Sequence, residues 1–313
     1  MICIIFHHLY QFLSSKYGLS FPLPAGILLQ NIGYLATGVF FIISGYGLFV
    51  SIKKNNPLDG RYIVKHLLNL YIPFLFVCII QSIINLLQGC FTTKSFLTSL
   101  LLMSDFWFMR TIFLLYISVF LINAFKISTK AKITILSLGI LGYVMISAFL
   151  FKIPAYWWNS ILCFPAGLYC AYYADSINLK NTTKNGISVL IVFIFTFCLN
   201  ILSKTRYCPQ IIGEFTYPIF MVLSAISFSL YAIHFASFIN VSNKVFNYFG
   251  TNSLCFYLYH FIFLKLCLFN NPFTYCISVW IGTIILVTLY RFIDKVCLSR
   301  ITSSLLSLKG GGI

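Results

Sequence analysis

The chain has 313 residues, of which 60% are apolar, 19% aromatic and only 8% charged. A soluble domain of this size needs more polar surface than these residues provide, so the composition excludes an ordinary globular protein. The net charge is +16, but the basic residues lie in short segments between apolar runs, which indicates membrane orientation rather than nucleic-acid binding.

Ten apolar segments follow one another along the chain and predict an all-α membrane protein, a polytopic bundle of about ten transmembrane helices. A bilayer core about 30 Å thick needs roughly 20 apolar residues per helix. We interpret residues 1–300 as one membrane domain and residues 301–313 as a short cytoplasmic tail. The segments cover residues 1–13, 31–52, 67–87, 110–125, 133–151, 157–174, 186–202, 212–238, 251–268 and 273–293.

The loops between these segments predict the orientation of the bundle. With the N-terminus inside, 14 Lys and Arg fall on the inner side and 7 on the outer side, which favours both termini in the cytoplasm. The first segment is short, because its 13 residues give only about 20 Å of helix. The eleven cysteines show no CxxC spacing, so we interpret them as packing residues, with no metal site and no disulfide framework.

Ionisable side chains within the apolar segments are candidates for function, because they are costly to bury in a bilayer. They are His7, His8, Arg110, Glu214, His234 and His260. His7 and His8 are consecutive in FHHLY, so they lie about 100° apart on a helix and only one can point squarely into a site. Imidazole suits the acceptance of a hydroxyl proton near neutral pH. A hydrogen bond between helices is the alternative role.

The sequence GVFFIISGYGL at residues 38–48 interrupts an apolar helix with small and polar residues. Gly38 and Gly45 are seven residues apart and share a face, which predicts close approach of a neighbouring helix. Ser44 and Tyr46 could add hydroxyls to a cavity wall. Ser44 is a weak candidate for a covalent nucleophile, since no base is evident beside it.

Two later stretches combine aromatic and polar residues. In DFWFM at residues 105–109, Trp107 could line a binding site or belong to an interfacial aromatic belt; Arg110 follows one turn later and could pair with Asp105. Ser253, Tyr257 and His260 recur at i, i+4 and i+7, which places them on one helix face. This stripe either lines the same cavity as His7 or joins helices by hydrogen bonds.

These motifs resemble those of the acyltransferase-3 family in order and spacing. The matching stretches are FHHLY (6–10), GVFFIISGYGL (38–48), DFWFM (105–109), FPAGLYCAYYAD (164–175) and GTNSLCFYLYHFIFL (250–264). The resemblance implies a membrane O-acyltransferase of the bacterial inner membrane. It further implies transfer of acetyl from acetyl-CoA to a hydroxyl of a cell-surface polysaccharide or its lipid-linked precursor.

The first-helix His of that family corresponds to His7, which the resemblance implies is the general base or the acyl carrier, with His8 as its orienting neighbour. Family members carry an Arg about three turns before this His, and the chain begins before that position. We therefore expect either a start assigned too late, which truncates the N-terminus, or the loss of a functional residue.

The implied donor, an acyl-CoA, is polyanionic and cytoplasmic, so its phosphates should meet basic residues on the inner side. Lys53, Lys54, Arg61 and Lys65 fit that requirement, although orientation signalling by loop charges explains them equally. The expected partners are the lipid bilayer, acyl-CoA and a carbohydrate acceptor, and not nucleic acid. A polysaccharide or glycolipid transporter or flippase is the rival class, without the pair of broken helices that would favour it. A catalytically inactive scaffold is the third class.

Overall fold

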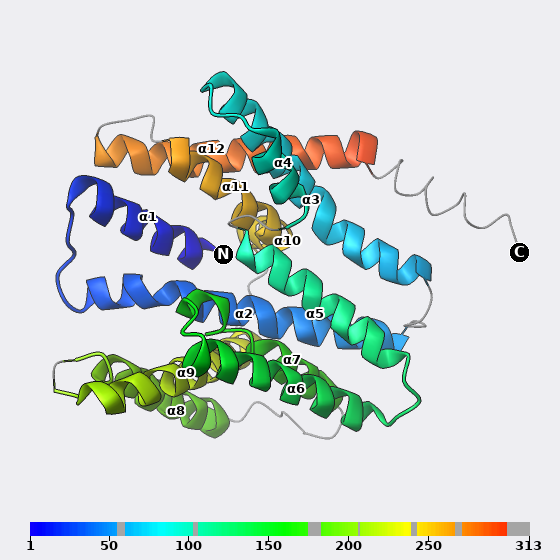
Figure 1. Cartoon of the computed structure of the whole chain (residues 1–313), viewed down its shortest axis with the longest axis vertical. Coiled ribbons are helices and arrows are strands. Elements are labelled where there is room, and N and C mark those ends of the chain that lie inside the picture. Colours follow the sequence, from blue (N-terminus) through cyan, green and yellow to red (C-terminus); the bar gives the residue numbers. More distant parts are fainter. Residues whose placement is uncertain are drawn as a thin grey trace, which may run out of the picture. The chain divides into compact units, whose positions relative to one another are not determined.

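The computed structural model describes residues 1–54, 60–102, 106–174, 183–205, 207–238, 243–266 and 271–298. In this part of the chain every regular element is a helix (Figure 1). In chain order the elements are α1 (Ile2–Tyr17), α2 (Ala25–Lys54), α3 (Gly60–Leu87), α4 (Thr93–Leu100), α5 (Trp107–Asn123), α6 (Thr129–Met145), η1 (Ile146–Leu150), η2 (Ala155–Trp157), α7 (Cys163–Tyr172), α8 (Thr183–Leu202), α9 (Gln210–Phe238), α10 (Lys244–Thr251), α11 (Ser253–Leu266), α12 (Pro272–Ile293) and η3 (Asp294–Leu298).

Long apolar helices identify the chain as a helical membrane protein. Among the described residues, six are long and apolar enough to cross a membrane, at Ala25–Lys54, Tyr62–Leu87, Thr129–Leu150, Lys184–Leu202, Gln210–Ala236 and Pro272–Val296. Each of the ten predicted segments coincides with a helix. The remaining four are the shorter helices α1, α5, α7 and α11, with 16, 17, 10 and 14 residues. The count of about ten transmembrane helices and the cytoplasmic position of both termini stay predictions.

The short helices α4 and α10 lie between the predicted segments and were not expected. Each begins at a polar cap: the hydroxyl of Thr92 accepts the backbone N–H of Ser95, and the side-chain oxygen of Asn243 accepts that of Val245. Such caps satisfy backbone N–H groups that have no partner within the helix. A search for segments of membrane-spanning length overlooks helices of eight residues.

Two compact units share the chain. Unit 1 comprises Met1–Gln30, Asp59–Arg110 and Ser242–Ile313, and unit 2 comprises Asn31–Leu58 and Thr111–Val241. Helices α2 and α5 contribute residues to both units.

Helix α11 forms the centre of unit 1, where it packs against α1, α3 and α12. Residues 255–260 are all buried, as expected for a helix that is apolar around most of its circumference. The hydroxyl of Tyr259 donates to the carbonyl of Pro73 in α3 at 3.4 Å, and the hydroxyl of Tyr275 in α12 donates to the carbonyl of Leu264 at 2.9 Å. These bonds fix α11, and the side chains it carries, against two neighbouring helices.

Glycines allow α2 and α7 to cross closely in unit 2. Gly45 of α2 faces the carbonyl oxygen of Phe164, and Gly167 of α7 faces the carbonyl oxygen of Ile42, so a Cβ at either position would overlap backbone atoms. A Cβ at Gly38 would stand only 2.7 Å from a hydroxyl of α9. The predicted close approach of neighbouring helices at Gly38 and Gly45 is confirmed.

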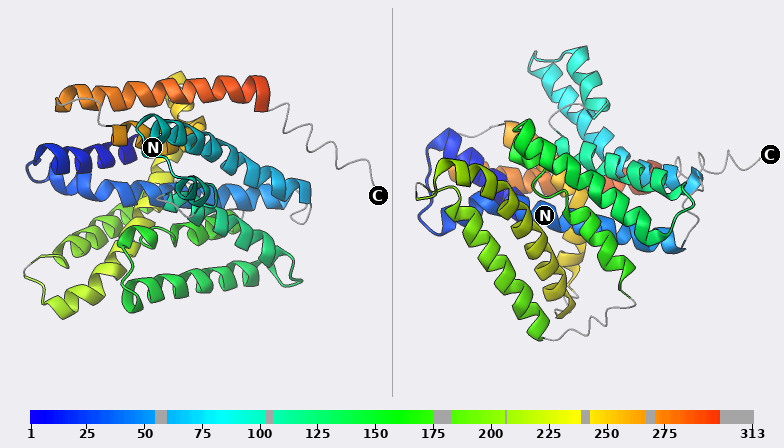
Figure 2. Two further views of the ribbon diagram at one scale, coloured as in Figure 1. Left: turned by 45° about the horizontal axis from the view of Figure 1, so that its top comes forward. Right: turned by 60° about the horizontal axis from the view of Figure 1, so that its bottom comes forward.

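Helices α8 and α9 form an antiparallel pair in unit 2 (Figure 2). A buried polar cluster centred on Tyr34 of α2 lies against them. The Tyr34 hydroxyl lies 2.9 Å from the Ser224 hydroxyl and accepts a hydrogen bond from the amide of Asn200 at 3.1 Å. The hydroxyl of Ser160 donates to the Tyr34 carbonyl at 2.8 Å. This cluster joins α2 to α8, α9 and the segment before α7.

Candidate active site

Three imidazoles gather in unit 1. His7 and His8 come from α1, and His260 comes from α11. The ring centroids of His7 and His8 are 5.1 Å apart, and those of His8 and His260 are 5.4 Å apart. His8 therefore lies between the other two rings, and the packing of α1 against α11 creates the cluster.

Hydrogen bonds define which ring nitrogen carries the proton in each neutral imidazole. The Nδ1 atom of His7 lies 2.8 Å from the carbonyl oxygen of Leu29 in α2, and a carbonyl oxygen can only accept. The other two rings donate within their own helices, His8 to the amide oxygen of Gln11 at 3.1 Å and His260 to the carbonyl four residues earlier at 3.0 Å. Each ring thus keeps its Nε2 lone pair as a proton acceptor.

Burial distinguishes the three imidazoles. His7 and His8 are half-buried, whereas His260 has 0% exposure. Among the described residues, the His260 Nε2 atom has no hydrogen-bond partner, which is unusual for a buried polar atom. His7 and His8 are accessible enough to contact a substrate, whereas the fully buried His260 is not.

A cavity of about 540 Å³ lies in the same unit, within the range of roughly 300–1,000 Å³ typical of small-molecule sites. Its lining includes uncharged polar side chains of α3, α4 and the residue before α4 and one cation of α11, namely Gln81, Ser82, Asn85, Thr92, Ser95, Ser99 and Lys265. Aromatic rings also line it, namely Phe12, Phe91, Phe96, Phe106, Tyr257 and Phe261. A mixture of hydroxyls, amides and aromatic rings suits a polyhydroxylated ligand.

Two aromatic residues connect the cavity to the imidazoles. Phe261 lines the cavity, and its ring centroid lies 4.6 Å from that of His8 and 4.3 Å from that of His260. Tyr257 also lines the cavity, with its ring 6.0 Å from that of His260. The histidine cluster therefore adjoins an aromatic wall of the cavity.

The phenylalanines on either side of Trp107 connect this segment to the cavity and to its lining residue Tyr257. Phe106 lines the cavity, and the Phe108 ring lies 4.7 Å from that of Tyr257. Trp107 packs edge-on against Phe108, and Trp107 and Arg110 are half-buried. Asp105, the expected partner of Arg110, lies outside the described residues.

Other predicted site residues are more dispersed. Ser253 is half-buried at the first turn of α11, while Tyr257 and His260 further along that helix are buried. Ser44 and Tyr46 belong to unit 2, half-buried and exposed respectively; their roles in a cavity wall stay predictions.

The basic residues expected to bind phosphates come from both units. Lys53 and Lys54 are exposed at the end of α2 in unit 2, and Lys65 is exposed on α3 in unit 1. The side chain of Arg61 lies outside the described residues. A joint site for acyl-CoA phosphates stays a prediction. In the described ranges no group of three or more His, Cys, Asp or Glu could hold a metal ion.

Apart from Tyr257, the polar residues that line the cavity were not predicted from the sequence. A detectable signal is present in the spacing. Gln81 and Asn85 are i, i+4 neighbours in an otherwise apolar segment, and the Gln81 amide donates to Asn85 at 3.0 Å. Thr92, Ser95 and Ser99 repeat every three or four residues, the period of one helix face.

Comparison with known proteins gives one match. A family model described as an acyltransferase domain matches residues 1–291 of the chain. No curated protein and no solved structure matches it.

Proposed function

The chain belongs to the acyltransferase-3 family and is a membrane acyltransferase, and from that premise we propose that it is an O-acetyltransferase of the bacterial inner membrane. In this proposal it transfers acetyl from acetyl-CoA to a hydroxyl of a cell-surface polysaccharide or its lipid-linked precursor. The observation that carries the proposal is the cluster of three imidazoles beside a cavity lined by hydroxyls, amides and aromatic rings.

Besides the donor thioester and the acceptor hydroxyl, the reaction requires only a base. An imidazole Nε2 takes the proton of the acceptor hydroxyl while the hydroxyl oxygen attacks the thioester carbonyl. The carbon–sulfur bond then breaks, and the coenzyme A thiolate recovers the proton as it leaves. General base catalysis of this kind typically contributes about 10²–10⁴-fold. Transient acyl transfer to the same nitrogen is the alternative route.

We assign the base to His7. Its Nδ1–H bond to Leu29 holds the ring against α2 and directs the basic Nε2 away from that bond. His8 packs between His7 and His260 and keeps the base oriented. His260 is fully buried and acts through His8, so it is a positioning residue.

The acceptor is assigned to the cavity of unit 1. Several of its lining residues, Phe91 to Ser99, belong to a loop that the charge distribution predicts on the outer side. Acyl-CoA is assigned to the inner side, where Lys53, Lys54, Arg61 and Lys65 supply positive charge. This arrangement separates a polyanionic donor from a sugar, which is recognised by stacking and hydrogen bonds.

The test measures ester-linked acetyl on purified surface polysaccharide from a deletion strain complemented with wild type or with His7→Gln. Glutamine is polar and uncharged but cannot act as a base, so the variant should lose at least about 100-fold of the transfer rate. Release of free coenzyme A thiol by the purified protein supplies the rate.

The matched control is His234→Gln, which removes an imidazole that packs against Gly186 in unit 2 and should leave transfer unchanged. Normal transfer by an equally abundant His7→Gln protein would remove His7 from the mechanism. Equal acetyl content in the deletion strain and its parent would refute the polysaccharide acceptor.

A further inference from the structure

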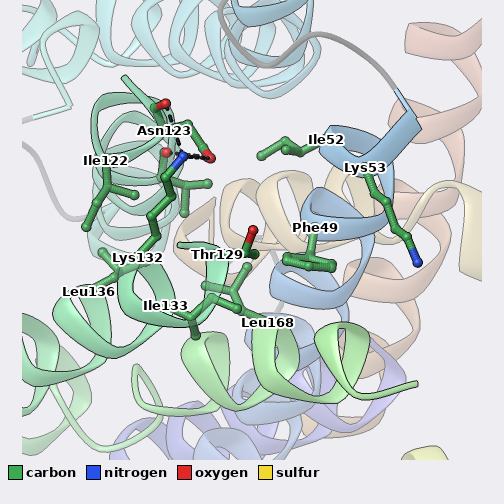
Figure 3. A pocket seen from close by; sticks show the side chains of 11 residues that line it. Phe49, Ile52, Lys53, Ile122, Asn123, Thr129, Lys132, Ile133, Leu136 and Leu168 are labelled. Atoms are coloured by element: carbon green, nitrogen blue, oxygen red, sulfur yellow. Dashed lines mark hydrogen bonds between the residues drawn. The ribbon is translucent and has the colours of Figure 1, made fainter. Parts of the chain in front are cut away.

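A second cavity, of about 270 Å³, lies entirely within unit 2. Its walls are apolar side chains of α2, α5, α6 and α7, namely Phe49, Ile52, Val119, Ile122, Ile133, Leu136 and Leu168. The polar lining residues stand at helix ends (Figure 3): Lys53 is the second-last residue of α2, Asn123 ends α5, and Thr129 and Lys132 are in the first turn of α6. The cavity is therefore apolar inside and polar where the helices end.

Lys132 supplies a positioned charge at this cavity. Its ammonium lies 3.3 Å from the carbonyl oxygen of Asn123 and 3.4 Å from the side-chain oxygen of the same residue. Asn123 ends α5, so its carbonyl lacks a partner within the helix. An ammonium has three N–H donors, and the two bonds to Asn123 leave one for a ligand. Lys53 also lines the cavity but points away from Lys132 (Figure 3), so the two ammonium groups do not share one contact.

The lining residues indicate which kind of ligand the cavity could bind. None of the described residues that line the cavity is acidic, so these residues do not repel an anionic group. Seven apolar side chains suit a hydrocarbon chain and offer nothing to the amides of a pantetheine arm or to a base. The volume is also slightly below the range of roughly 300–1,000 Å³ for whole small-molecule ligands, which favours part of one acyl chain.

We propose that this cavity binds an anionic phospholipid, with one acyl chain between α2, α5, α6 and α7 and the headgroup phosphate bonded to Lys132. In the predicted orientation the mouth faces the inner leaflet, where Lys126 and Lys130 add positive charge. Basic pockets between transmembrane helices on the cytoplasmic side are suited to acidic lipid headgroups. None of its lining residues belongs to the histidine cluster, and it shares Lys53 with the basic residues assigned to acyl-CoA in the proposed function.

The experiment is a lipid titration of the purified full chain in a neutral detergent, followed by native mass spectrometry. Phosphatidylglycerol should bind more tightly than phosphatidylcholine with the same chains. Lys132→Gln should weaken phosphatidylglycerol binding about fivefold, the equivalent of about 1 kcal/mol per basic residue at a membrane surface. Phosphatidylcholine carries the same phosphate beside a compensating choline cation, so its weaker binding should fall by a smaller factor.

Lys130→Gln is the matched control, since it removes an equal charge from an exposed position two residues away on the same helix and should weaken phosphatidylglycerol binding much less than Lys132→Gln. Lys132→Arg should also retain binding. If Lys132 only caps α5, Lys132→Gln lowers the thermal midpoint without lipid but leaves lipid affinity intact, and the proposal fails. It fails equally if glycerol phosphate without acyl chains, or acetyl-CoA, displaces the bound lipid.

Discussion

Replacing Gly45 by alanine tests the close crossing of α2 and α7. The added Cβ would overlap the carbonyl oxygen of Phe164 and stand 3.1 Å from its carbon and 3.3 Å from the nitrogen of Leu168. Overpacking typically costs about 1–3 kcal/mol. Because both neighbours are backbone atoms that cannot rotate away, we expect the upper part of that range, about 2–3 kcal/mol.

The matched control is Gly47→Ala in the same helix, where an added Cβ meets nothing within 4 Å. Both substitutions gain the same helix propensity, about 0.5–1 kcal/mol, so their difference isolates the packing cost. The assay is unfolding in mixed micelles of dodecyl maltoside and sodium dodecyl sulfate, followed by far-ultraviolet circular dichroism. If Gly45→Ala unfolds within about 0.5 kcal/mol of Gly47→Ala, a threshold well below the expected overpacking cost, the close crossing is refuted.

Two further substitutions, one in each unit, test side-chain packing in the same assay. Tyr34→Phe should cost about 1–3 kcal/mol, because the amide of buried Asn200 loses the hydroxyl to which it donates; a value near zero would show that the polar cluster contributes nothing. Gly282→Ala should destabilise less than Gly45→Ala, since its Cβ would overlap the ring of Phe263, a side chain that can shift. Gly139→Ala, in open space, is the control, and equal stability of the two would contradict the contact.

The sequence was a good guide to elements and to glycine contacts. Ten apolar segments all correspond to helices, because apolar length is a strong local signal in membrane proteins. Gly38 and Gly45 could be assigned to helix crossings, since a gap of seven residues returns to the same helix face. The family followed from the order of short motifs and is confirmed over residues 1–291.

The partners of the candidate site could not be predicted in the same way. Phe108 and Phe261 contact Tyr257 and the imidazoles, yet in the sequence they are ordinary apolar positions. Which faces meet depends on side-chain shapes from helices far apart in the chain, and no local pattern encodes that pairing. Neutral polar residues such as Gln81 and Ser95 were missed because they lie outside the motifs on which the family resemblance rests.

The burial of His260 in α11 has a consequence for biosynthesis. A helix of 14 residues is shorter than the roughly 20 needed to cross a bilayer, and residues 255–260, which include His260, are all buried. The helix gains its partners in α1 and α3, made earlier, and in α12, made later. A nascent chain that has not yet released α12 from the ribosome would leave one side of this histidine helix uncovered in the membrane, so α11 settles only after α12 has been made.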